Sequence, residues 1–301
     1  IQETLNKCVG MFALAVWDKS TAKLTLARDR LGEKPLYYGW VNDSFVFASE
    51  LKAIKIFPSF SNSIDRDALA SYLQYTYVPA PMSIYENIFK LLPGHLMEID
   101  RSSKSNTHNS SLQYWSLSSH IKSGQSEMIT DETMAIEELD SLLMQSIKSQ
   151  MISDVPLGAF LSGGIDSSLI VALMQKESMK PIKTFTIGFE DANYDESPYA
   201  KGVASYLNTD HHALIVSETE TQSVIPLLGD MYDEPFADSS QIPTYLVCKA
   251  AKEYVTVALS GDAGDELFGG YNRYFWGPRV WNKLSWMPYE ARKLLGKGIN
   301  A

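Results

Sequence analysis

The segment LSGGIDSS, residues 161–168, carries residue types that together can bind a phosphate group. It follows an apolar run at 156–162 that predicts a strand, and it leads into a helical pattern that begins at Ile165. Ligands bind at such strand-to-helix junctions in open α/β sheets, because the first N–H groups of the helix have no partner within it. Asp166 would repel a bare phosphate, so its presence indicates a divalent cation between the two.

This loop by itself leaves a second interpretation open, in which a Gly-Gly turn and a Ser or Asp residue only cap a helix. The segment is not a Walker loop, since no Gly-Lys-Ser or Gly-Lys-Thr follows, and GxGxxG is absent as well. A second loop, SGDAGDELFGGY at 260–271, also follows an apolar strand pattern, at 255–259. Two such loops in one parallel sheet would lie at the same edge.

The two loops resemble motifs of a known family. SGGIDS at 162–167 resembles the SGGxDS pyrophosphate loop of the ATP pyrophosphatases, and the second loop resembles the SGxGxDExFGGY motif of glutamine-hydrolysing asparagine synthetases. Segments of the first half resemble the later part of that family's class II glutaminase domain: GMFA (10–13), RDRLG (28–32), KPLYY (34–38) and ASELKA (48–53). The resemblance covers nearly the whole chain. It implies ATP-dependent amidation of aspartate to asparagine through a β-aspartyl-adenylate, with ammonia taken from glutamine.

The resemblance also implies roles for individual residues and two cofactors, ATP and magnesium. The residues that would hold ATP are Leu161, Ser162, Gly163, Gly164, Asp166, Ser167, Ser168, Ile187, Ser260 and Gly261. Asp166 and Asp265 would hold magnesium from two loops. Asp262 would be catalytic, at a position where some members carry Glu. For Asp262 and Glu266, a role as a solvated or capping carboxylate stays open.

The segment YDEPFADSS, residues 232–240, resembles a family segment near the substrate pocket. The resemblance implies that four of its residues recognise an amino-acid head group: Asp233, Glu234, Asp238 and Ser239. An equally open alternative is a loop that caps the helix expected from Ile242, with Ser239 or Ser240 as the cap.

The elements that must position these residues divide the chain into two halves of an α/β protein. Short apolar runs at 10–17, 23–29, 36–40 and 44–49, separated by turns, predict an antiparallel meander, and a helix follows at 65–75. Residues 101–111 are polar and predict a loop. From a helix at 132–151 onward, strands and helices alternate, which predicts a parallel sheet covered on both faces.

With the resemblance, the expected domains are two. Residues 1–130 would be the later portion of a glutaminase sandwich of the N-terminal-nucleophile type. Residues 131–301 would be an ATP-pyrophosphatase domain with the adenine nucleotide α-hydrolase-like fold, truncated at its C-terminus.

Two departures from the family pattern affect the expected activity. The family's glutaminase begins with a cysteine whose own α-amine is the base, whereas this chain begins at Ile1 and Cys8 is internal. No glutaminase nucleophile is therefore expected in this chain. The family places a catalytic lysine well beyond its second motif, in a region that the chain, ending at Ala301, does not reach. We expect a fragment that is inactive alone.

Composition excludes several other classes of protein. The net charge of −10 disfavours binding to duplex nucleic acid, which needs a basic face. Two cysteines cannot form a disulfide framework or a four-cysteine zinc site. No apolar run reaches the roughly 18 residues of a membrane span, so we expect a cytoplasmic protein without membrane contact. A homodimer of the longer protein is compatible with the resemblance.

Two alternative functions remain open. One is a related amidotransferase that acts on another carboxylate, in a sugar or a peptide, or that closes a β-lactam ring, since pocket residues set the acceptor. The other is a non-catalytic nucleotide-binding fragment.

Overall fold

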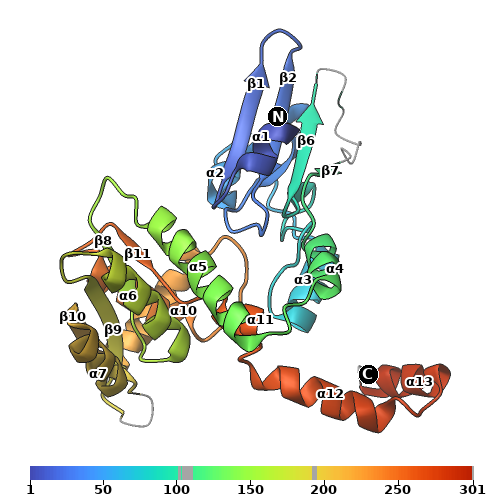
Figure 1. Ribbon diagram of the computed structural model, residues 1–301. Helices are drawn as coiled ribbons and strands as arrows, with labels where there is room; N and C mark the ends of the chain where they lie inside the picture. Colours follow the sequence, from blue (N-terminus) through green and yellow to red (C-terminus); the bar gives the residue numbers. More distant parts are fainter. Residues whose placement is uncertain (101–102, 104–110, 192–194, 300–301) are drawn as a thin grey trace. The chain divides into compact units, whose positions relative to one another are not determined.

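The computed structural model describes residues 1–100, 103, 111–191 and 195–299 (Figure 1). The chain forms two compact units, of which the first comprises Ile1–Ala135 and Ser223–Gln241. The second comprises Ile136–Gln222 and Ile242–Ala301. Most of the loop predicted at 101–111 falls outside the described residues. Among the helices of the described residues, none is both long and apolar enough to span a membrane.

The first unit contains two antiparallel sheets that share a core. One sheet has the order β1-β2-β6-β7, formed by β1 (Ala13–Asp18), β2 (Lys23–Arg28), β6 (His95–Ile99) and β7 (Leu112–Gln113). The other has the order β4-β3-β5, formed by β3 (Tyr37–Val41), β4 (Ser44–Ala48) and β5 (Ile88–Lys90). Leu26 and Met97 of the first sheet lie in one apolar cluster with Tyr38 and Phe45 of the second.

The four strands predicted between residues 10 and 49 are confirmed as antiparallel strands, but the prediction of one continuous meander is wrong. β2 pairs with β6, and β3 pairs with β4 and β5, so the chain changes sheet between β2 and β3. The reason lies in the connecting loop. The fully buried Asp29 carboxylate accepts hydrogen bonds from the loop N–H groups of Leu31, Glu33 and Lys34. These bonds turn the chain away from β2.

The helices of the first unit are short. They are α1 (Gln2–Lys7), α2 (Leu51–Lys55), α3 (Arg66–Tyr75), α4 (Leu117–Ser126), the 3-10 turn η1 (Ile225–Leu227) and α9 (Leu228–Met231). The predicted helix at 65–75 is confirmed as α3, and the Asp65 side chain caps it by accepting from the N–H groups of Asp67 and Ala68. The others were not predicted. Of these, α1, α2 and α9 have 6, 5 and 4 residues, and helices this short depend on tertiary packing.

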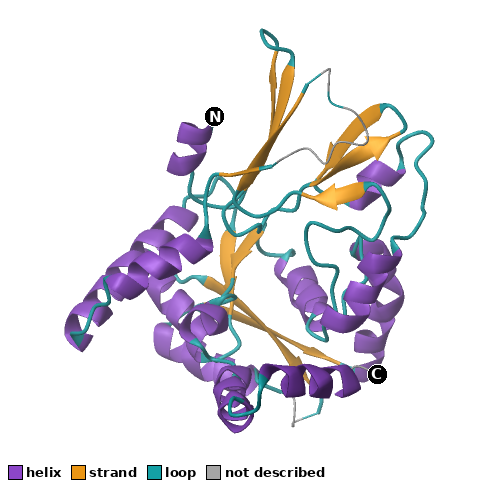
Figure 2. Ribbon diagram, turned by 90° about the vertical axis from the view of Figure 1, so that its right-hand side faces the viewer, coloured by secondary structure: helices purple, strands orange, loops and turns teal. Residues whose placement is uncertain are grey.

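The second unit contains the predicted parallel sheet, which confirms the α/β class (Figure 2). Its strand order is β10-β9-β8-β11, formed by β8 (Leu157–Phe160), β9 (Lys183–Phe189), β10 (Asp210–Val216) and β11 (Val257–Leu259). The helices of this unit are α6 (Ile165–Glu177) and α7 (Ser197–Leu207) and, apart from a few end residues, α5 (Glu132–Gln150), α8 (Glu218–Val224) and α10 (Gln241–Ala251). Side chains of α5, α6 and α7 form one apolar cluster with β8, and Ala251 of α10 packs with Phe185 in another.

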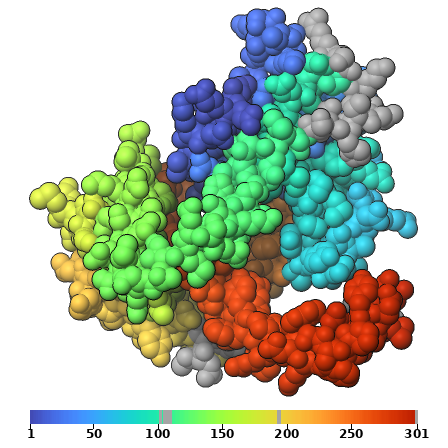
Figure 3. Space-filling view, turned by 45° about the vertical axis from the view of Figure 1, so that its right-hand side comes forward, coloured from blue at the N-terminus to red at the C-terminus, as the bar shows by residue number. Residues whose placement is uncertain are grey.

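Three helices follow β11: α11 (Gly264–Phe268), α12 (Asn272–Leu284) and α13 (Tyr289–Ile299). Figure 3 shows α12 and α13 in red at the surface. Their aromatic side chains are largely exposed, as at Trp276 of α12 and Tyr289 of α13. The sheet, rather than these helices, therefore positions the two motif loops.

Candidate functional site

The first motif loop leaves the sheet at the end of β8. The N–H of the buried Leu161 donates to the carbonyl of Phe185 in β9, at 2.9 Å, which extends the strand pairing to the start of the loop. Gly163 then turns the chain with φ +82°, and a Cβ there would lie 2.7 Å from the backbone nitrogen of Ala200 in α7. Only glycine fits both conditions. The loop ends where α6 begins at Ile165.

Two serines hold this loop in shape. The Oγ atoms of Ser162 and Ser167 are 2.9 Å apart, and the Ser162 N–H donates to Ser167 Oγ at 3.2 Å. The Gly164 N–H donates to Ser162 Oγ at 3.3 Å. These hydroxyls organise the turn, but they do not cap α6, because its N-cap residue is Gly164 and no side-chain capping bond is formed there. They also fix it in a form that presents the first N–H groups of α6 at the sheet edge.

The second motif loop touches the first. β11 runs parallel to β8, with Leu259 opposite Ala159, so both loops leave the sheet at the same edge. A Cβ on Gly261 would lie 2.7 Å from the Ser167 nitrogen, and a Cβ on Gly264 would overlap the Asp166 carboxylate. Absence of side chains at these two glycines allows the loops to meet.

The other residues assigned to ATP lie at the same edge or beside it. Ile187 lies near the carboxyl end of β9, two residues beyond the Phe185 carbonyl that pairs with Leu161. Ser168 differs from the rest. Its hydroxyl is buried, has no partner among the described residues, and lines a groove of about 430 Å³ that Leu169, Gly202 and Tyr206 also line.

The carboxylates of the two loops have different partners. Asp166 and Asp265 are half-buried, and neither carboxylate makes a hydrogen bond or ion pair with another described residue. Asp262 accepts from Ser260 Oγ at 2.9 Å. Glu266 accepts from the Tyr271 hydroxyl at 2.9 Å, and this bond raises the pKa of Tyr271. The two carboxylates assigned to magnesium are thus the two without protein partners.

These two carboxylates fit a magnesium ion. Asp166 faces the backbone of Gly264, and Asp265 is the next residue along the same loop. Magnesium is commonly held by one or two carboxylates together with substrate phosphates. Within the described part of the chain, no group of three or more His, Cys, Asp and Glu side chains forms a metal site.

Comparison with known proteins agrees with this geometry. The model of the asparagine synthase family matches residues 138–300, which contain both loops. The chain belongs to the asparagine synthase family. A glutamine amidotransferase domain model matches residues 2–115, in the first unit.

Two curated relatives of this family match over most of the chain. One is named "Putative asparagine synthetase, glutamine-hydrolyzing, 2" in Methanocaldococcus jannaschii, and it is 40% identical over 90% of this chain and 51% of its own length. The other is the glutamine-hydrolyzing asparagine synthetase 1 of Bacillus subtilis, 37% identical over 91% of this chain and 41% of its own length. The chain thus spans about half the length of these relatives or less.

The structure places Asp233, one of the predicted substrate residues, in the first unit at the start of α2. Its carboxylate accepts from the N–H groups of Leu51 at 2.7 Å and Lys52 at 3.1 Å. The N-cap residue of α2, Glu50, makes no side-chain capping bond. Asp233 therefore caps α2 from a distant part of the sequence.

Glu234 lies beside it, with partners from three segments of the first unit. It accepts from the Ile84 N–H at 2.8 Å and from the Tyr37 hydroxyl at 3.2 Å, and it forms an ion pair with Lys90. Burial, and next the charge of Glu234, raise the pKa of Tyr37, and burial lowers the pKa of Lys90. Neither Asp233 nor Glu234 is in the unit that carries the motif loops.

The last two predicted substrate residues precede α10. The Asp238 carboxylate accepts from the Ser240 N–H at 2.8 Å, which lowers the pKa of Asp238. Ser239 is exposed. This local turn leads into α10, which begins at Gln241.

Sequence reasoning missed one feature of the second loop. The family motif SGxGxDE has a glycine at the position of Ala263, and the structure holds Ala263 at φ +74°, in the left-handed region. A side chain at this φ is strained by about 1–2 kcal/mol. The sequence signal for this strain was the alanine at position 263, where the motif has glycine.

Proposed function

We propose that this chain is part of a glutamine-dependent asparagine synthetase, which amidates aspartate through a β-aspartyl-adenylate. The observation that carries the proposal is the contact of the two motif loops, with Gly264 against the Asp166 carboxylate. This contact joins a phosphate-binding turn and two unpartnered carboxylates at one edge of a parallel sheet. Such a combination suits binding of a nucleoside triphosphate with a divalent cation.

In the proposed reaction, a carboxylate oxygen of aspartate attacks the α-phosphorus of ATP and pyrophosphate leaves. Ammonia then attacks the acyl carbon of the adenylate, AMP leaves, and the nitrogen loses a proton to give the amide. The N–H groups at the start of α6, with Ser162 and Ser167, would bind the pyrophosphate. Leu161, Ile187, Ser260 and Gly261 would hold the adenosine at the ends of β8, β9 and β11.

The acidic residues have separate roles in this proposal. Magnesium, when bound, supplies charge neutralisation for the departing pyrophosphate, and Asp166 and Asp265 are the residues that would hold it. Asp262, held by the Ser260 hydroxyl at 2.9 Å, would accept the proton that ammonia loses on attack. Glutamine as the ammonia source, and aspartate as the acceptor, are proposed for the whole protein.

The first test is ATP binding by calorimetry, with and without magnesium, to the wild-type chain and to Asp166→Ala. Asp154→Ala is the matched control, because Asp154 is exposed and precedes β8 at the opposite edge of the same sheet. We expect Asp166→Ala to weaken magnesium-dependent ATP binding by at least about tenfold, and Asp154→Ala to leave it unchanged. Equal affinities for wild type and Asp166→Ala in magnesium would contradict the proposed site.

The second test identifies the acceptor by trapping acyl-adenylates with hydroxylamine, using the protein at the length of its relatives. We expect a hydroxamate from aspartate and none from glutamate or a sugar carboxylate. A hydroxamate from another carboxylate would support the related amidotransferase instead. Magnesium-dependent ATP binding with no hydroxamate from any carboxylate would favour the non-catalytic nucleotide-binding alternative.

A further inference from the structure

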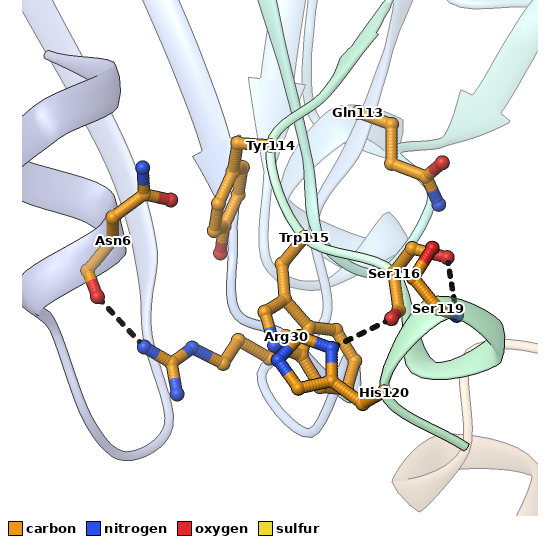
Figure 4. Close-up of a pocket in the computed structure, with 8 residues that line it drawn as sticks. All are labelled: Asn6, Arg30, Gln113, Tyr114, Trp115, Ser116, Ser119 and His120. Carbon is orange, nitrogen blue, oxygen red and sulfur yellow. Dashed lines mark hydrogen bonds between the residues drawn. The ribbon is translucent and has the colours of Figure 1, made fainter. Parts of the chain in front are cut away.

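An open pocket of about 470 Å³ lies in the first unit, and none of its lining residues is assigned to ATP (Figure 4). Its walls come from four elements: α1, the loop after β2, β7 with the segment that follows it, and α4. All of these elements are within residues 1–135 of the first unit. The pocket therefore does not depend on the placement of the second unit.

Arg30 is the charged residue of this pocket. Its guanidinium donates from Nη2 to the backbone carbonyl of Asn6 at 2.8 Å, as Figure 4 shows, and its Nε is buried with no partner. No carboxylate of the described residues forms an ion pair with Arg30, although the chain has more acidic than basic residues. A partly buried cation without a counter-charge is unfavourable, and a bound anion would remove that penalty.

Next to Arg30, two aromatic rings form one wall. The rings of Trp115 and His120 are 4.8 Å apart between centroids and tilted by 31°, and both residues line the pocket together with Arg30 (Figure 4). His120 Nδ1 is 2.9 Å from the Ser116 carbonyl, which can only accept, so Nδ1 carries the proton. This bond fixes the imidazole against the indole. The wall suits a planar apolar group.

The start of α4 contributes to the same pocket. Ser116 is the N-cap of this ten-residue helix, and its hydroxyl accepts from the Ser119 N–H at 3.4 Å. Both serines line the pocket. The N-terminus of a helix carries a partial positive charge, which adds to that of Arg30. The polar side of the pocket is therefore built for negative charge.

We propose that this pocket binds a small monocarboxylate with a planar, aromatic body. One guanidinium balances one negative charge, and its planar fork matches a carboxylate. The carboxylate would lie between Arg30 and the serines of α4, and the ring would lie on the Trp115 side. The proposal does not rest on asparagine synthetase activity, because the pocket shares no residue with the motif loops.

Benzoate is the probe for the test, and three compounds separate the features of the pocket. Benzamide has the ring without the charge, cyclohexanecarboxylate has the charge without the planar ring, and inorganic phosphate is a different anion. Binding is followed by NMR at the indole N–H of Trp115, with the exposed Trp17 of β1 as an internal reference. We expect benzoate to shift the Trp115 signal and to bind at least fivefold more tightly than each of the other three.

Two variants test the assignment to individual residues. Arg30→Gln should weaken benzoate binding at least tenfold, whereas Arg66→Gln, at an exposed arginine of α3, should leave it unchanged. Circular dichroism checks that Arg30→Gln is folded, and Arg30→Lys, which keeps the charge, should retain part of the affinity. Equal affinity of wild type and Arg30→Gln would overturn the proposal. If Arg30→Gln does not fold, equal binding of benzoate and benzamide to wild type overturns it.

Discussion

The segment that follows β2 in the first unit and the segment that follows β8 in the second each carry an aspartate, and they use it in opposite ways. Asp29 lies in a loop, and Asp166 lies in the first turn of α6. Asp29 is fully buried, and its carboxylate accepts from four backbone N–H groups, including that of Phe12. Asp166 is half-buried and has no partner among the described residues. A carboxylate saturated by backbone bonds stabilises a loop, whereas one left unpaired at a sheet edge is available to a ligand.

Arg28 and Arg30, the residues on either side of Asp29, show the same contrast. Arg28 donates to the carbonyls of Lys34, Leu91 and Gly32, at 2.9, 2.8 and 2.6 Å, and so has its bonding capacity largely filled by backbone. Arg30 has one such bond and an unpartnered Nε. The number of hydrogen bonds that a charged side chain makes within the protein, rather than its residue type, therefore distinguishes the charged residues that stabilise the fold from those proposed to bind a ligand.

The largest expected effect comes from removing the saturated aspartate. Asp29→Ala should destabilise the first unit by about 3–5 kcal/mol, because four partly buried N–H groups lose their acceptor at about 1 kcal/mol each. Urea unfolding measures the change, and Asp43→Ala, at an exposed turn residue, is the control. A loss of stability in Asp29→Ala as small as that in Asp43→Ala would show that the hydrogen bonds of Asp29 do not stabilise the first unit.

Gly264→Ala should move the Asp166 carboxylate without replacing Asp166 itself. The new Cβ would overlap the Asp166 carboxylate and displace it, so magnesium-dependent ATP affinity should fall by about tenfold, or about 1.4 kcal/mol. Calorimetry measures the affinity. Gly202→Ala in α7, where a Cβ meets nothing within 4 Å, should leave ATP binding as in wild type. Unchanged binding by Gly264→Ala would show that Asp166 does not need this contact.

A smaller effect should appear in the pH dependence of the first unit. Tyr37 keeps its proton to higher pH in the folded state, since its pKa is raised above the ordinary value near 10.0 by burial and by Glu234. The folded state then binds more protons above about pH 10, so stability should fall as pH rises, by up to about 1.4 kcal/mol per pH unit. In Tyr37→Phe this slope should be shallower. Urea unfolding measures the free energy of unfolding at each pH. The same dependence on pH in wild type and Tyr37→Phe would show that Tyr37 does not cause the loss of stability.

The smallest effect concerns one left-handed residue in each unit, Ala263 between β11 and α11 and Gly32 after β2. Ala263→Gly should stabilise the second unit by about 0.5 kcal/mol, because relief of backbone strain slightly exceeds the entropy that glycine loses on folding. Gly32→Ala in the first unit should destabilise it, since φ there is +73° and a Cβ would lie 2.7 Å from Pro93. Thermal unfolding measures both. Stabilisation by Gly32→Ala, or destabilisation by Ala263→Gly, would contradict this expectation.

Much of the second unit could be predicted from sequence because its signals are local. Apolar runs marked β8, β9 and β10 to within a few residues, and the alternation with helices predicted a parallel sheet. The order of strands then placed both motif loops at one edge. In the first unit, the same kind of pattern predicted β1 to β4 but not the second partner of β2, because pairing between β2 and β6 joins residues about 70 positions apart.

The sequence by itself determined where Asp29, Asp166, Asp233 and Glu234 stand relative to strands and helices. Only the tertiary structure decided which of them keeps a free carboxylate. Asp233 meets the N–H groups of α2, and Glu234 meets Lys90, from segments more than a hundred residues away in the chain. A carboxylate's neighbours along the sequence do not specify these partners. Donors from distant segments fill the hydrogen-bonding capacity of Asp233 and Glu234. Asp166, at the edge of the sheet, meets no such donor among the described residues, so its carboxylate is available to a ligand.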